Sequence, residues 1–455
     1  MVDTPSGLDS LDSLAKTGIM GRASNRERKA EIVFQAPRGT QDVLPEEQPH
    51  WAAVEAEARR LASLYGYRRM ETPVFEDTGL YVRGVGEGTD IVEKEMYTFL
   101  DKGGDSLSLR PEYTAGIMRA YLEHGMHTRP QPVKVYSIGP IFRYERPQAG
   151  RLRQHTQFNV EAIGEADPAL DVEIMSIAYQ LYAGLGFQGL SYQLNSIGCP
   201  ICRPGYIERL VEYYRPYVAG LCPECPRRLE RNPLRVLDCK DERCQEVIAG
   251  APRIEAYLCP DCARHFQLVL SYLDRLGRPY QLNHRLVRGL DYYTRTVFEV
   301  WAQGIGAQNA LCGGGRYDGL AEALGGPPTP GVGFASGIER IILLMRQQQL
   351  PVRPVAEPQV MIAPQGDEAR AAAVSLVTGL RNGGTGALLA FGERSLRAQL
   401  RQANRAGVRY VVIIGPEEMA ESRATLRDMT TGEQWSEPQS AVVEAIRARV
   451  DHGRG

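Results

Sequence analysis

Apolar residues recur at helical spacing in three widely separated stretches of the chain. The run from Trp51 to Leu64 keeps one apolar face, which predicts an amphipathic helix over residues 46–65. The same periodicity predicts helices over residues 169–185 and 336–348. The last of these begins after a glycine-rich segment, which we interpret as a turn.

Strand-like runs lie between these helices. Residues 133–138 and 157–163 are rich in β-favouring residues and bracket a polar, arginine-rich loop, which predicts an antiparallel hairpin. Residues 190–194 and 296–301 are two further predicted strands. The stretch 198–265 has few β-branched runs, so we interpret it as a small insertion between these two strands.

The pattern changes after residues 350–358, a proline-containing stretch without periodicity that predicts a linker. Beyond it, apolar runs at 360–363, 387–391 and 410–414 alternate with helical stretches. That alternation is typical of a separate α/β domain with a largely parallel sheet.

Composition places the chain among globular proteins of more than one domain. Its 455 residues predict two or three domains, and 43% hydrophobic with 24% charged residues is an ordinary globular balance. The net charge of −2 is compatible with a nucleic-acid partner only through a local basic surface. No apolar run is long enough to span a bilayer, and no apolar signal core precedes residue 34. We therefore expect a cytoplasmic protein without a membrane partner.

Eight of the nine cysteines are concentrated between residues 199 and 262. Without a signal peptide, such clustering favours metal binding over disulfides. Three CxxC pairs and a fourth, wider pair provide thiolates for one or two tetrahedral Zn²⁺ ions, and their pairing stays open. Reduced, buried thiols are the alternative, and we expect this state for Cys312. The candidate zinc ligands are Cys199, Cys202, Cys222, Cys225, Cys239, Cys244, Cys259 and Cys262.

Two polar stretches contain clustered arginines or tyrosines. Residues 142–154 place four arginines and two glutamines on the predicted hairpin loop, where guanidinium groups can neutralise a polyphosphate. A solvated surface hairpin is the alternative. Residues 288–299 join a charged, aromatic loop to a strand, an arrangement that can build a small-molecule pocket unless the tyrosines only pack.

Two further stretches are glycine-rich or acidic. The glycines of residues 313–319 and 331–337 let backbone approach a ligand, but neither segment matches a phosphate-binding motif, and ordinary turns are the simpler interpretation. Glu112 and Thr114 follow a strand-like run, where alternation predicts that both face one side and can hold an ammonium group. A surface glutamate and a capping threonine are the alternative.

In this order and spacing, the four stretches resemble histidyl-tRNA synthetases, a family of class II aminoacyl-tRNA synthetases. The likeness begins at Arg38-Gly-Thr-Gln-Asp and covers nearly all of the chain from residue 34 onward. Its most specific element is Arg-Gly-Leu-Asp-Tyr-Tyr at residues 288–293. It implies an α+β catalytic domain with an antiparallel sheet flanked by helices, a small Cys-rich insertion and a C-terminal α/β anticodon-binding domain. Residues 71–75 are similar to the class II dimer motif, which implies a homodimer.

The resemblance also suggests where one domain ends and the next begins. We expect a disordered tail at residues 1–33, catalytic domain at 34–197 and 279–349, the Cys-rich insertion at 198–278, the linker at 350–358, and the anticodon-binding domain at 359–455.

The implied enzyme is a histidine–tRNA ligase. It activates L-histidine with ATP to histidyl-adenylate, transfers the histidyl group to the 3′ end of histidine tRNA, and releases AMP and pyrophosphate. ATP is a substrate, and Mg²⁺ bridges its phosphates. Both reactants of the first step are anions, so catalysis depends on positioning and on cationic stabilisation of the spreading charge.

The resemblance assigns the ATP and histidine sites residue by residue. Arg143 and Arg288 are its catalytic arginines, on opposite sides of the α-phosphate; Arg340 is similar to the γ-phosphate arginine and Glu145 to the adenine-contacting glutamate. His155 stands where a phenylalanine commonly stacks on adenine. The implied histidine site comprises Glu112, Tyr113, Thr114, Arg143, Gln157, Glu161, Arg288, Tyr292 and Tyr293.

Within that site, Glu161 and Tyr293 resemble the pair that hydrogen-bonds the imidazole. A donor and an acceptor matched to both ring nitrogens would reject isosteres strongly, because such ligands leave buried groups unpaired. Tyr113 stands where the family usually has a glycine.

The resemblance also implies contacts with tRNA. Arg146, Gln148 and Arg153 in the hairpin loop are candidates for touching the acceptor end, whose stem the insertion covers. Several arginines between residues 394 and 405 could meet the tRNA backbone, with a solvated helix face as the alternative.

Two other functions share parts of this pattern. A regulatory paralogue that partners a short ATP phosphoribosyltransferase has the same catalytic fold, but it usually lacks the Arg-Gly-Leu-Asp-Tyr-Tyr sequence and the anticodon-binding domain. This chain contains that sequence, and its C-terminal region resembles that domain. A zinc- or RNA-binding protein with an inactive synthetase body is the second alternative. The intact Arg143, Arg288 and Arg340 argue against it.

Overall fold

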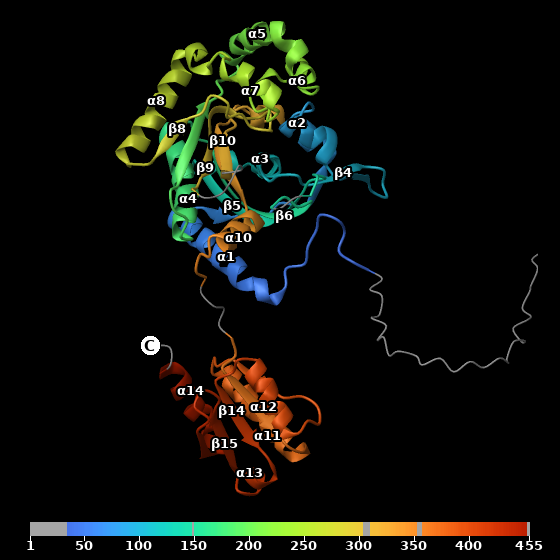
Figure 1. Cartoon of the computed structure of the whole chain (residues 1–455), viewed down its shortest axis with the longest axis vertical. Helices are drawn as coiled ribbons and strands as arrows, with labels where there is room; N and C mark the ends of the chain where they lie inside the picture. Colours follow the sequence, from blue (N-terminus) through green and yellow to red (C-terminus); the bar gives the residue numbers. More distant parts are fainter. Residues whose placement is uncertain (1–33, 148–149, 304–309, 353–356, 453–455) are drawn as a thin grey trace, which may run out of the picture.

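The described chain forms two bodies, each built on its own sheet (Figure 1). The structure is a computed structural model, and it describes residues 34–147, 150–303, 310–352 and 357–452. The tail expected at residues 1–33 and the candidate Gln148 lie outside the described residues. No helix in these ranges is long and apolar enough to cross a membrane.

An eight-stranded sheet organises the first body. Neighbouring strands run antiparallel except at the two edges, where β1 pairs with β5 and β7 with β8 in parallel. The antiparallel core of the sheet agrees with the predicted fold class. The strand order is β1 (Arg68–Arg69), β5 (Val133–Phe142), β6 (Gln154–Ile163), β11 (Gly331–Gly337), β10 (Ala310–Arg316), β9 (Thr294–Trp301), β7 (Ser191–Ser196) and β8 (Tyr280–Leu282).

Three long helices share one apolar core with one face of this sheet. They are α1 (Gln48–Leu64), α4 (Pro168–Gly184) and α10 (Ile338–Gln347), and their buried side chains pack with Phe158 and Phe298 of the sheet. Asp167 caps α4 by accepting the N–H of Ala169 at 2.8 Å. The helical periodicity therefore predicted α1 and α4 correctly.

The opposite face of the sheet is covered by short elements. They are α2 (Thr78–Val85), the π-helical turn η2 (Ile91–Glu95), α3 (Thr114–Glu123) and α9 (Leu320–Ala323). A small separate sheet of β2 (Phe75–Asp77), β4 (Ser106–Leu109) and β3 (Thr98–Leu100) adjoins α2. Strand β6 contributes to both faces of the sheet. Phe158 and Val160 belong to the first apolar core, while Ile163 belongs to a second apolar core that it shares with α3.

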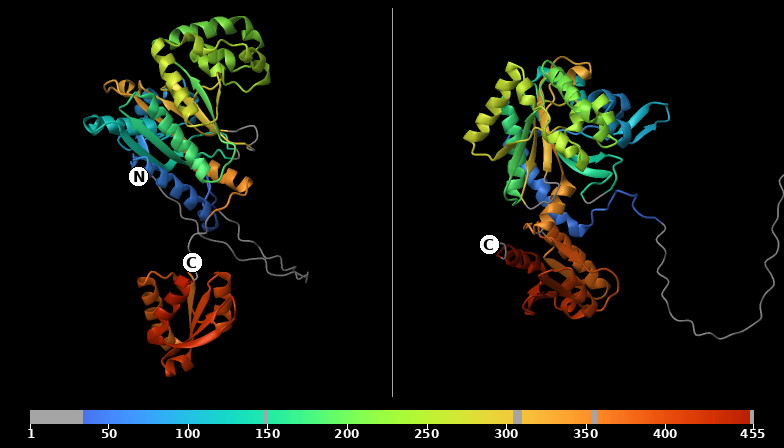
Figure 2. Two further views of the ribbon diagram at one scale, coloured as in Figure 1. Left: turned by 90° about the vertical axis from the view of Figure 1, so that its left-hand side faces the viewer. Right: turned by 45° about the horizontal axis from the view of Figure 1, so that its top comes forward.

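The cysteine-rich stretch between β7 and β8 is helical. It contains α5 (Arg203–Tyr214), α6 (Cys225–Arg231), α7 (Glu242–Ala249) and α8 (Pro260–Arg275), linked by short 3₁₀ turns. Figure 2 shows the green helices α5, α6 and α7 gathered beyond one end of the sheet, while the yellow α8 packs against α4 of the main body. Tyr206, Leu210 and Ile248 share the second apolar core with Val297 and Tyr317, so the insertion packs directly on the catalytic body.

The C-terminal body has a five-stranded mixed sheet between helices. Strands β12 (Val360–Pro364), β13 (Ala387–Leu389) and β14 (Tyr410–Ile414) are parallel, as predicted. The sheet continues with antiparallel β15 (Arg423–Asp428) and β16 (Gln434–Pro438), which the sequence reading missed because their charged residues conceal the alternation. The helices are α11 (Asp367–Asn382), α12 (Leu396–Arg405), α13 (Pro416–Ala420) and α14 (Val442–His452).

The two glycine-rich segments are central strands of the main sheet, so their interpretation as turns was wrong. Glycines 313–315 lie in β10, and residues 331–337 form β11, which delays the start of the following helix to Ile338. A Cβ at Gly314 would overlap the carbonyl of Gly333 on the neighbouring strand. Glycine is therefore used here because neighbouring groups come close to the backbone, not because the chain turns.

Candidate functional site

A cavity of about 100 Å³ lies on the face of the sheet opposite α1 and α4. Each of the nine residues of the implied histidine site lines it, and these nine come from four separate segments of the sequence. The rest of the wall is formed by Asn159, Leu290, Gly313, Tyr317, Gly333, Phe334 and Ala335. The predicted residues in this cavity are Glu112, Tyr113, Thr114, Arg143, Gln157, Glu161, Arg288, Tyr292 and Tyr293.

Strand β6 presents three polar side chains to this cavity. Gln157, Asn159 and Glu161 alternate along the strand and share one face. The buried side-chain oxygens Gln157 Oε1 and Asn159 Oδ1 have no hydrogen-bond partner among the described residues. Buried polar atoms normally have partners, so these two oxygens are free to accept N–H groups of a ligand. The sequence analysis missed Asn159, although the strand alternation would have identified it.

Glu161 is the centre of the cavity's hydrogen bonding. Its carboxylate is buried and accepts from Thr114 Oγ1 at 2.6 Å, from Tyr317 Oη at 2.6 Å and from Asn159 Nδ2 at 3.1 Å. Burial raises the pKa of Glu161 to about 7, although these hydrogen bonds oppose the rise. A Cβ at Gly333 would overlap this carboxylate, which explains a glycine on the neighbouring strand.

Glu112 and Thr114 reach the cavity from a helix start. The strand alternation predicted for them was wrong, because Thr114 is the first residue of α3. The Glu112 carboxylate accepts the backbone N–H groups of Thr114 at 2.6 Å and Ala115 at 2.8 Å, which satisfies two donors of the first helical turn. Burial nonetheless raises the pKa of Glu112.

Two adjacent tyrosines line the cavity from the loop before β9. The rings of Tyr292 and Tyr293 lie 4.8 Å apart, and Tyr292 Oη donates to Glu112 Oε2 at 3.3 Å. Burial raises the pKa of Tyr293, so its hydroxyl remains protonated at neutral pH and can donate a hydrogen bond. Tyr317 packs edge-on against Tyr292 and was not identified from the sequence.

Arg143 and Arg288 line the same cavity from different elements. Arg288 lies against the backbone of Gly313, where a Cβ would overlap its guanidinium, and it donates to Glu299 of β9 at 2.8 Å. Arg143 directly follows β5, and its Nε donates to the carbonyl of Pro111 at 2.8 Å. Both guanidinium groups are therefore oriented by fixed neighbours, and Glu299 is a partner that the sequence analysis missed.

The remaining ATP candidates lie beside the hairpin of β5 and β6. Arg340 is in the first turn of α10 and does not line the 100 Å³ cavity. Gly337 separates it from His155, since a Cβ there would lie 4.0 Å from both side chains. Burial, with a contribution from Arg143, lowers the pKa of His155 to about 4, so its ring is neutral at pH 7 and can stack like the phenylalanine it replaces. Glu145 faces Arg151 at 3.3 Å and Arg143 at 3.9 Å.

The tRNA candidates of the hairpin differ in accessibility. Arg146 is exposed. Arg153 is half-buried, with its guanidinium stacked 3.7 Å from the ring centre of Tyr144 and its side chain packed on Gly39. Arg146 is therefore the more accessible of these two arginines.

Tyr113 fills space beside the cavity. Its ring is buried, Arg110 stacks on it at 4.1 Å, and its hydroxyl accepts from Arg110 at 2.7 Å. A Cβ at Gly139 would overlap that hydroxyl, so a glycine on β5 accommodates the tyrosine.

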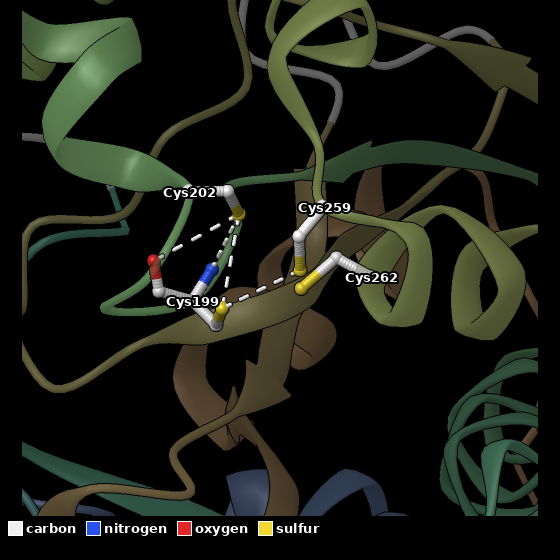
Figure 3. Close-up of side chains that lie close together, drawn as sticks. All are labelled: Cys199, Cys202, Cys259 and Cys262. Carbon is white, nitrogen blue, oxygen red and sulfur yellow. Dashed lines mark hydrogen bonds between the residues drawn. The ribbon is translucent and has the colours of Figure 1, made fainter.

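The eight clustered cysteines form two separate groups of four. The first thiolate cluster is Cys199, Cys202, Cys259 and Cys262, and the second is Cys222, Cys225, Cys239 and Cys244. In each group all four sulfur atoms lie within 4.8 Å of one another. Figure 3 shows the first cluster, with two cysteines beside the start of α5 and two beside the start of α8. The structure thus resolves a pairing that the spacing left open.

Family comparisons cover both bodies. The family profile described as "Histidyl-tRNA synthetase" matches residues 39–199 and 242–341, and the profile described as "Anticodon binding domain" matches residues 359–449. Residues 200–241, which contain four of the clustered cysteines, fall between the matched segments of the first profile.

Individual relatives agree with these matches. A Dehalococcoides mccartyi protein named "Histidine--tRNA ligase" is 53% identical over 92% of this chain and all of its own length. The structure of apo S. aureus histidyl-tRNA synthetase has a TM-score of 0.76 and 38% identity, covering 90% of this chain and 99% of that one. A Bacillus halodurans structure described as an ATP phosphoribosyltransferase regulatory subunit/histidyl-tRNA synthetase has a TM-score of 0.58 and 21% identity, covering 85% of this chain and 99% of that one, and shares the fold alone.

Proposed function

The chain belongs to the histidyl-tRNA synthetase family, and from this premise we propose which of its side chains carry the reaction. The enzyme activates L-histidine with ATP, forms histidyl-adenylate and charges histidine tRNA, releasing pyrophosphate and AMP. The observation that carries the assignment is the single cavity into which four distant segments bring all nine candidate histidine-site residues.

Recognition of the imidazole requires one acceptor and one donor. A neutral imidazole has one N–H and one unprotonated nitrogen. We assign the acceptor role to Glu161 and the donor role to Tyr293, whose hydroxyl keeps its proton. The open oxygens of Gln157 and Asn159, together with Glu112, are acceptors for the α-ammonium group. An apolar isostere of histidine would leave these buried groups unpaired.

Activation of histidine is an in-line attack of its carboxylate on the α-phosphorus of ATP. Negative charge spreads over the phosphate oxygens as pyrophosphate leaves. Arg143 and Arg288 line one cavity and would stabilise that charge from two sides. ATP enters as its Mg²⁺ complex, with the ion bridging the phosphates. Arg340, at the hairpin, is assigned to the distal phosphate, and His155 and Glu145 to the adenine.

Transfer requires the 3′ end of the tRNA to reach the adenylate. We propose Arg146, Gln148 and Arg153 as contacts of the acceptor end. Arg397, Arg401 and Arg405 form an exposed row on α12 that can meet the tRNA backbone. We also propose the domain boundaries given in the sequence analysis. The proposed location is the cytoplasm, where charged tRNA is used in translation.

Aminoacylation tests this function directly. Full-length protein is incubated with labelled histidine, ATP and histidine tRNA, with and without the extra 5′ guanosine of that tRNA. Charging of the tRNA that carries the guanosine, and weaker charging of the other, is the expected result. Absence of charging on both substrates, under conditions where another histidyl-tRNA synthetase is active, would reject the function.

The face around β2 and β3 is the proposed homodimer interface. Phe75, Phe99 and Leu100 expose 52%, 43% and 72% of their surface, and the two phenylalanine rings lie 6.5 Å apart. A cavity of about 830 Å³, lined by residues 68–73, 129–130 and 132–135 among others, adjoins the same segment. An apolar patch beside a large hollow is typical of a protein interface.

Sedimentation velocity is expected to show twice the chain mass for the wild type and a monomer for Phe75→Asp, because a buried carboxylate without a partner destabilises an interface. Phe391→Asp is the matched control, since Phe391 is also exposed, at 69%, but lies in the C-terminal body. A wild-type monomer at micromolar concentration would refute the interface.

Both cysteine clusters fit a structural zinc ion. A tetrahedral site with Zn–S bonds of about 2.3 Å separates its sulfur atoms by about 3.8 Å. The Sγ–Sγ distances are 3.8 Å for Cys199 with Cys202 and with Cys259, and 3.7 Å for Cys222 with Cys239. In addition, the N–H of Cys199 points at Cys202 Sγ, 3.3 Å away, as a supporting donor. We therefore propose two zinc ions per chain, both structural, with neither taking part in the chemical step.

Elemental analysis of protein purified without chelators is expected to give two zinc ions per chain. Cys239→Ser should lower that value to about one, since three thiolates hold zinc less tightly than four. Cys312→Ser should leave two, because Cys312 is buried in β10, outside both clusters. A metal-free wild type with nine free thiols would refute zinc binding.

A further inference from the structure

The first thiolate cluster lies between two segments that both contact the start of β9. Cys199 and Cys202 precede α5, while Cys259 and Cys262 are at the start of α8. We infer that this cluster and Arg203 form a clamp that positions Tyr293 in the histidine pocket, so that the occupied cluster supports histidine affinity. The inference rests on the proposed function and adds Arg203 as a positioning residue.

The Cys202 side of the clamp is a network of carbonyl contacts made by Arg203. Its Nη2 donates to the backbone carbonyl of Tyr293 at 2.6 Å and to that of Gly198 at 3.2 Å, and its Nε donates to Ile197 at 2.9 Å. One guanidinium thus binds carbonyl groups from residues 197–198 and from residue 293, and it belongs to the residue that directly follows Cys202. Charged donors make stronger hydrogen bonds than neutral ones, so this contact restrains the Tyr293 backbone.

Backbone hydrogen bonds continue this attachment into β9. The N–H of Ile197 donates to the carbonyl of Arg295, and the N–H of Arg295 donates to the carbonyl of Gly198, each at 2.8 Å. Gly198 has a φ of +69°, and a Cβ there would lie 2.9 Å from Cys202 Sγ. The backbone at residues 197–198, which pairs with β9, therefore packs closely against Cys202 Sγ.

Arg295 has an unfavourable backbone conformation that needs such support. Its φ of +49° is in the left-handed region, which is uncommon for residues other than glycine. Such conformations persist where the surroundings determine them, and they concentrate near functional sites. Tyr293 lies two residues before this position, so a relaxed Arg295 would alter the direction from which Tyr293 enters the cavity.

The Cys262 side of the clamp reaches the same position through His265. Arginine can only donate, so the 3.4 Å contact makes His265 Nδ1 the acceptor of Arg295 Nη1. His265 Nε2 then donates to Asp171 at 3.1 Å, and the buried Arg316 also donates to Asp171, at 2.8 Å. Both halves of the cluster therefore connect to residues 293–295, and an ion shared by the four sulfur atoms would hold the two halves together.

The test separates histidine binding from ATP binding in the full-length enzyme. Arg203→Met should raise KM for histidine about 10- to 100-fold, the effect expected from losing a charged hydrogen-bond donor, with KM for ATP changed less than twofold. Arg203→Lys should recover part of the loss, because an ammonium group can still donate to Tyr293. Arg209→Met is the matched control, since Arg209 is an exposed residue of the same helix paired with Glu212 at 2.9 Å.

The metal is tested independently of Arg203. Cys259→Ser should remove one zinc equivalent and raise KM for histidine while KM for ATP stays constant. An unchanged KM for histidine in folded Arg203→Met or Cys259→Ser, or an equal rise for both substrates, overturns the clamp. Wild-type protein without histidine-dependent ATP–pyrophosphate exchange would instead reject the proposed function, so the two failures are distinguishable.

Discussion

Arg288→Ala is expected to slow histidyl-adenylate formation by about 10³-fold while histidine affinity changes less than about threefold, the pattern of a contact made mainly in the transition state. In the ligand-free structure Arg288 is held by Glu299 and by the backbone of Gly313, within reach of the cavity. Its charge is therefore already oriented before negative charge develops on the phosphate. Single-turnover measurement of adenylate formation, with equilibrium binding of histidine, separates the two quantities.

Arg285→Ala provides the control for this prediction. Arg285 lies three residues earlier in the same loop, but its guanidinium donates to Gln245 of the insertion at 3.0 Å and does not line the cavity. Adenylate formation should stay within a few-fold of the wild-type rate in this control. A normal rate in Arg288→Ala, or a loss of histidine binding as large as the loss in rate, would contradict the role assigned to Arg288.

Glu161→Gln is expected to lower kcat/KM for histidine by about 10²- to 10³-fold, because the amide replaces one of the two acceptor oxygens with a donor NH₂ in a buried site that already presents donors to it. The substitution keeps the side-chain volume beside Gly333, so the cavity should keep its shape. KM for ATP should hardly change. Glu173→Gln is the control, because Glu173 of α4 accepts a hydrogen bond from Tyr67 and does not line the cavity. Unchanged histidine kinetics in Glu161→Gln would remove Glu161 from the recognition site.

The pH dependence of unfolding checks the same residue without substrate. Burial raises the pKa of Glu161 from its ordinary 4.5 to about 7, so the folded state retains this proton where the unfolded state has lost it. Its stabilising contribution is complete below pH 4.5 and is lost as the pH rises through 7, a decrease of up to about 3 kcal/mol. Urea unfolding of the ligand-free catalytic body between pH 5 and 8 should therefore show a smaller decrease for Glu161→Gln than for the wild type. Equal decreases would show that this carboxyl is not titrating in that range.

Local patterns were sufficient for the elements whose apolar residues repeat. Periodicity predicted α1 and α4, and alternation predicted the hairpin of β5 and β6. Strands β10 and β11 were not predicted, because glycine has a low propensity for strands. Their glycines leave room for side chains that are far away in the sequence: Gly333 accommodates Glu161, and Gly313 accommodates Arg288. That requirement is visible only once the strands are side by side.

Some residues of the candidate site could be predicted from the sequence, and others could not. Residues in recognisable motifs, such as Arg288 and Tyr293, could be proposed from the sequence because the motif carries them. Tyr317 and Glu299 could not, since their partners Glu161 and Arg288 are brought to them by sheet pairing. Likewise, spacing showed that the cysteines form pairs, but only the fold joins the pair at Cys199 to the pair at Cys259.

Amino-acid-dependent ATP–pyrophosphate exchange tests the central claim most directly, namely that the cavity of Glu161, Tyr293 and the two arginines selects and activates histidine. The full-length protein is assayed with each of the twenty amino acids in turn. Exchange that depends on histidine, with the others near background, is the predicted result. Exchange with a different amino acid, or no exchange with histidine, would contradict the account.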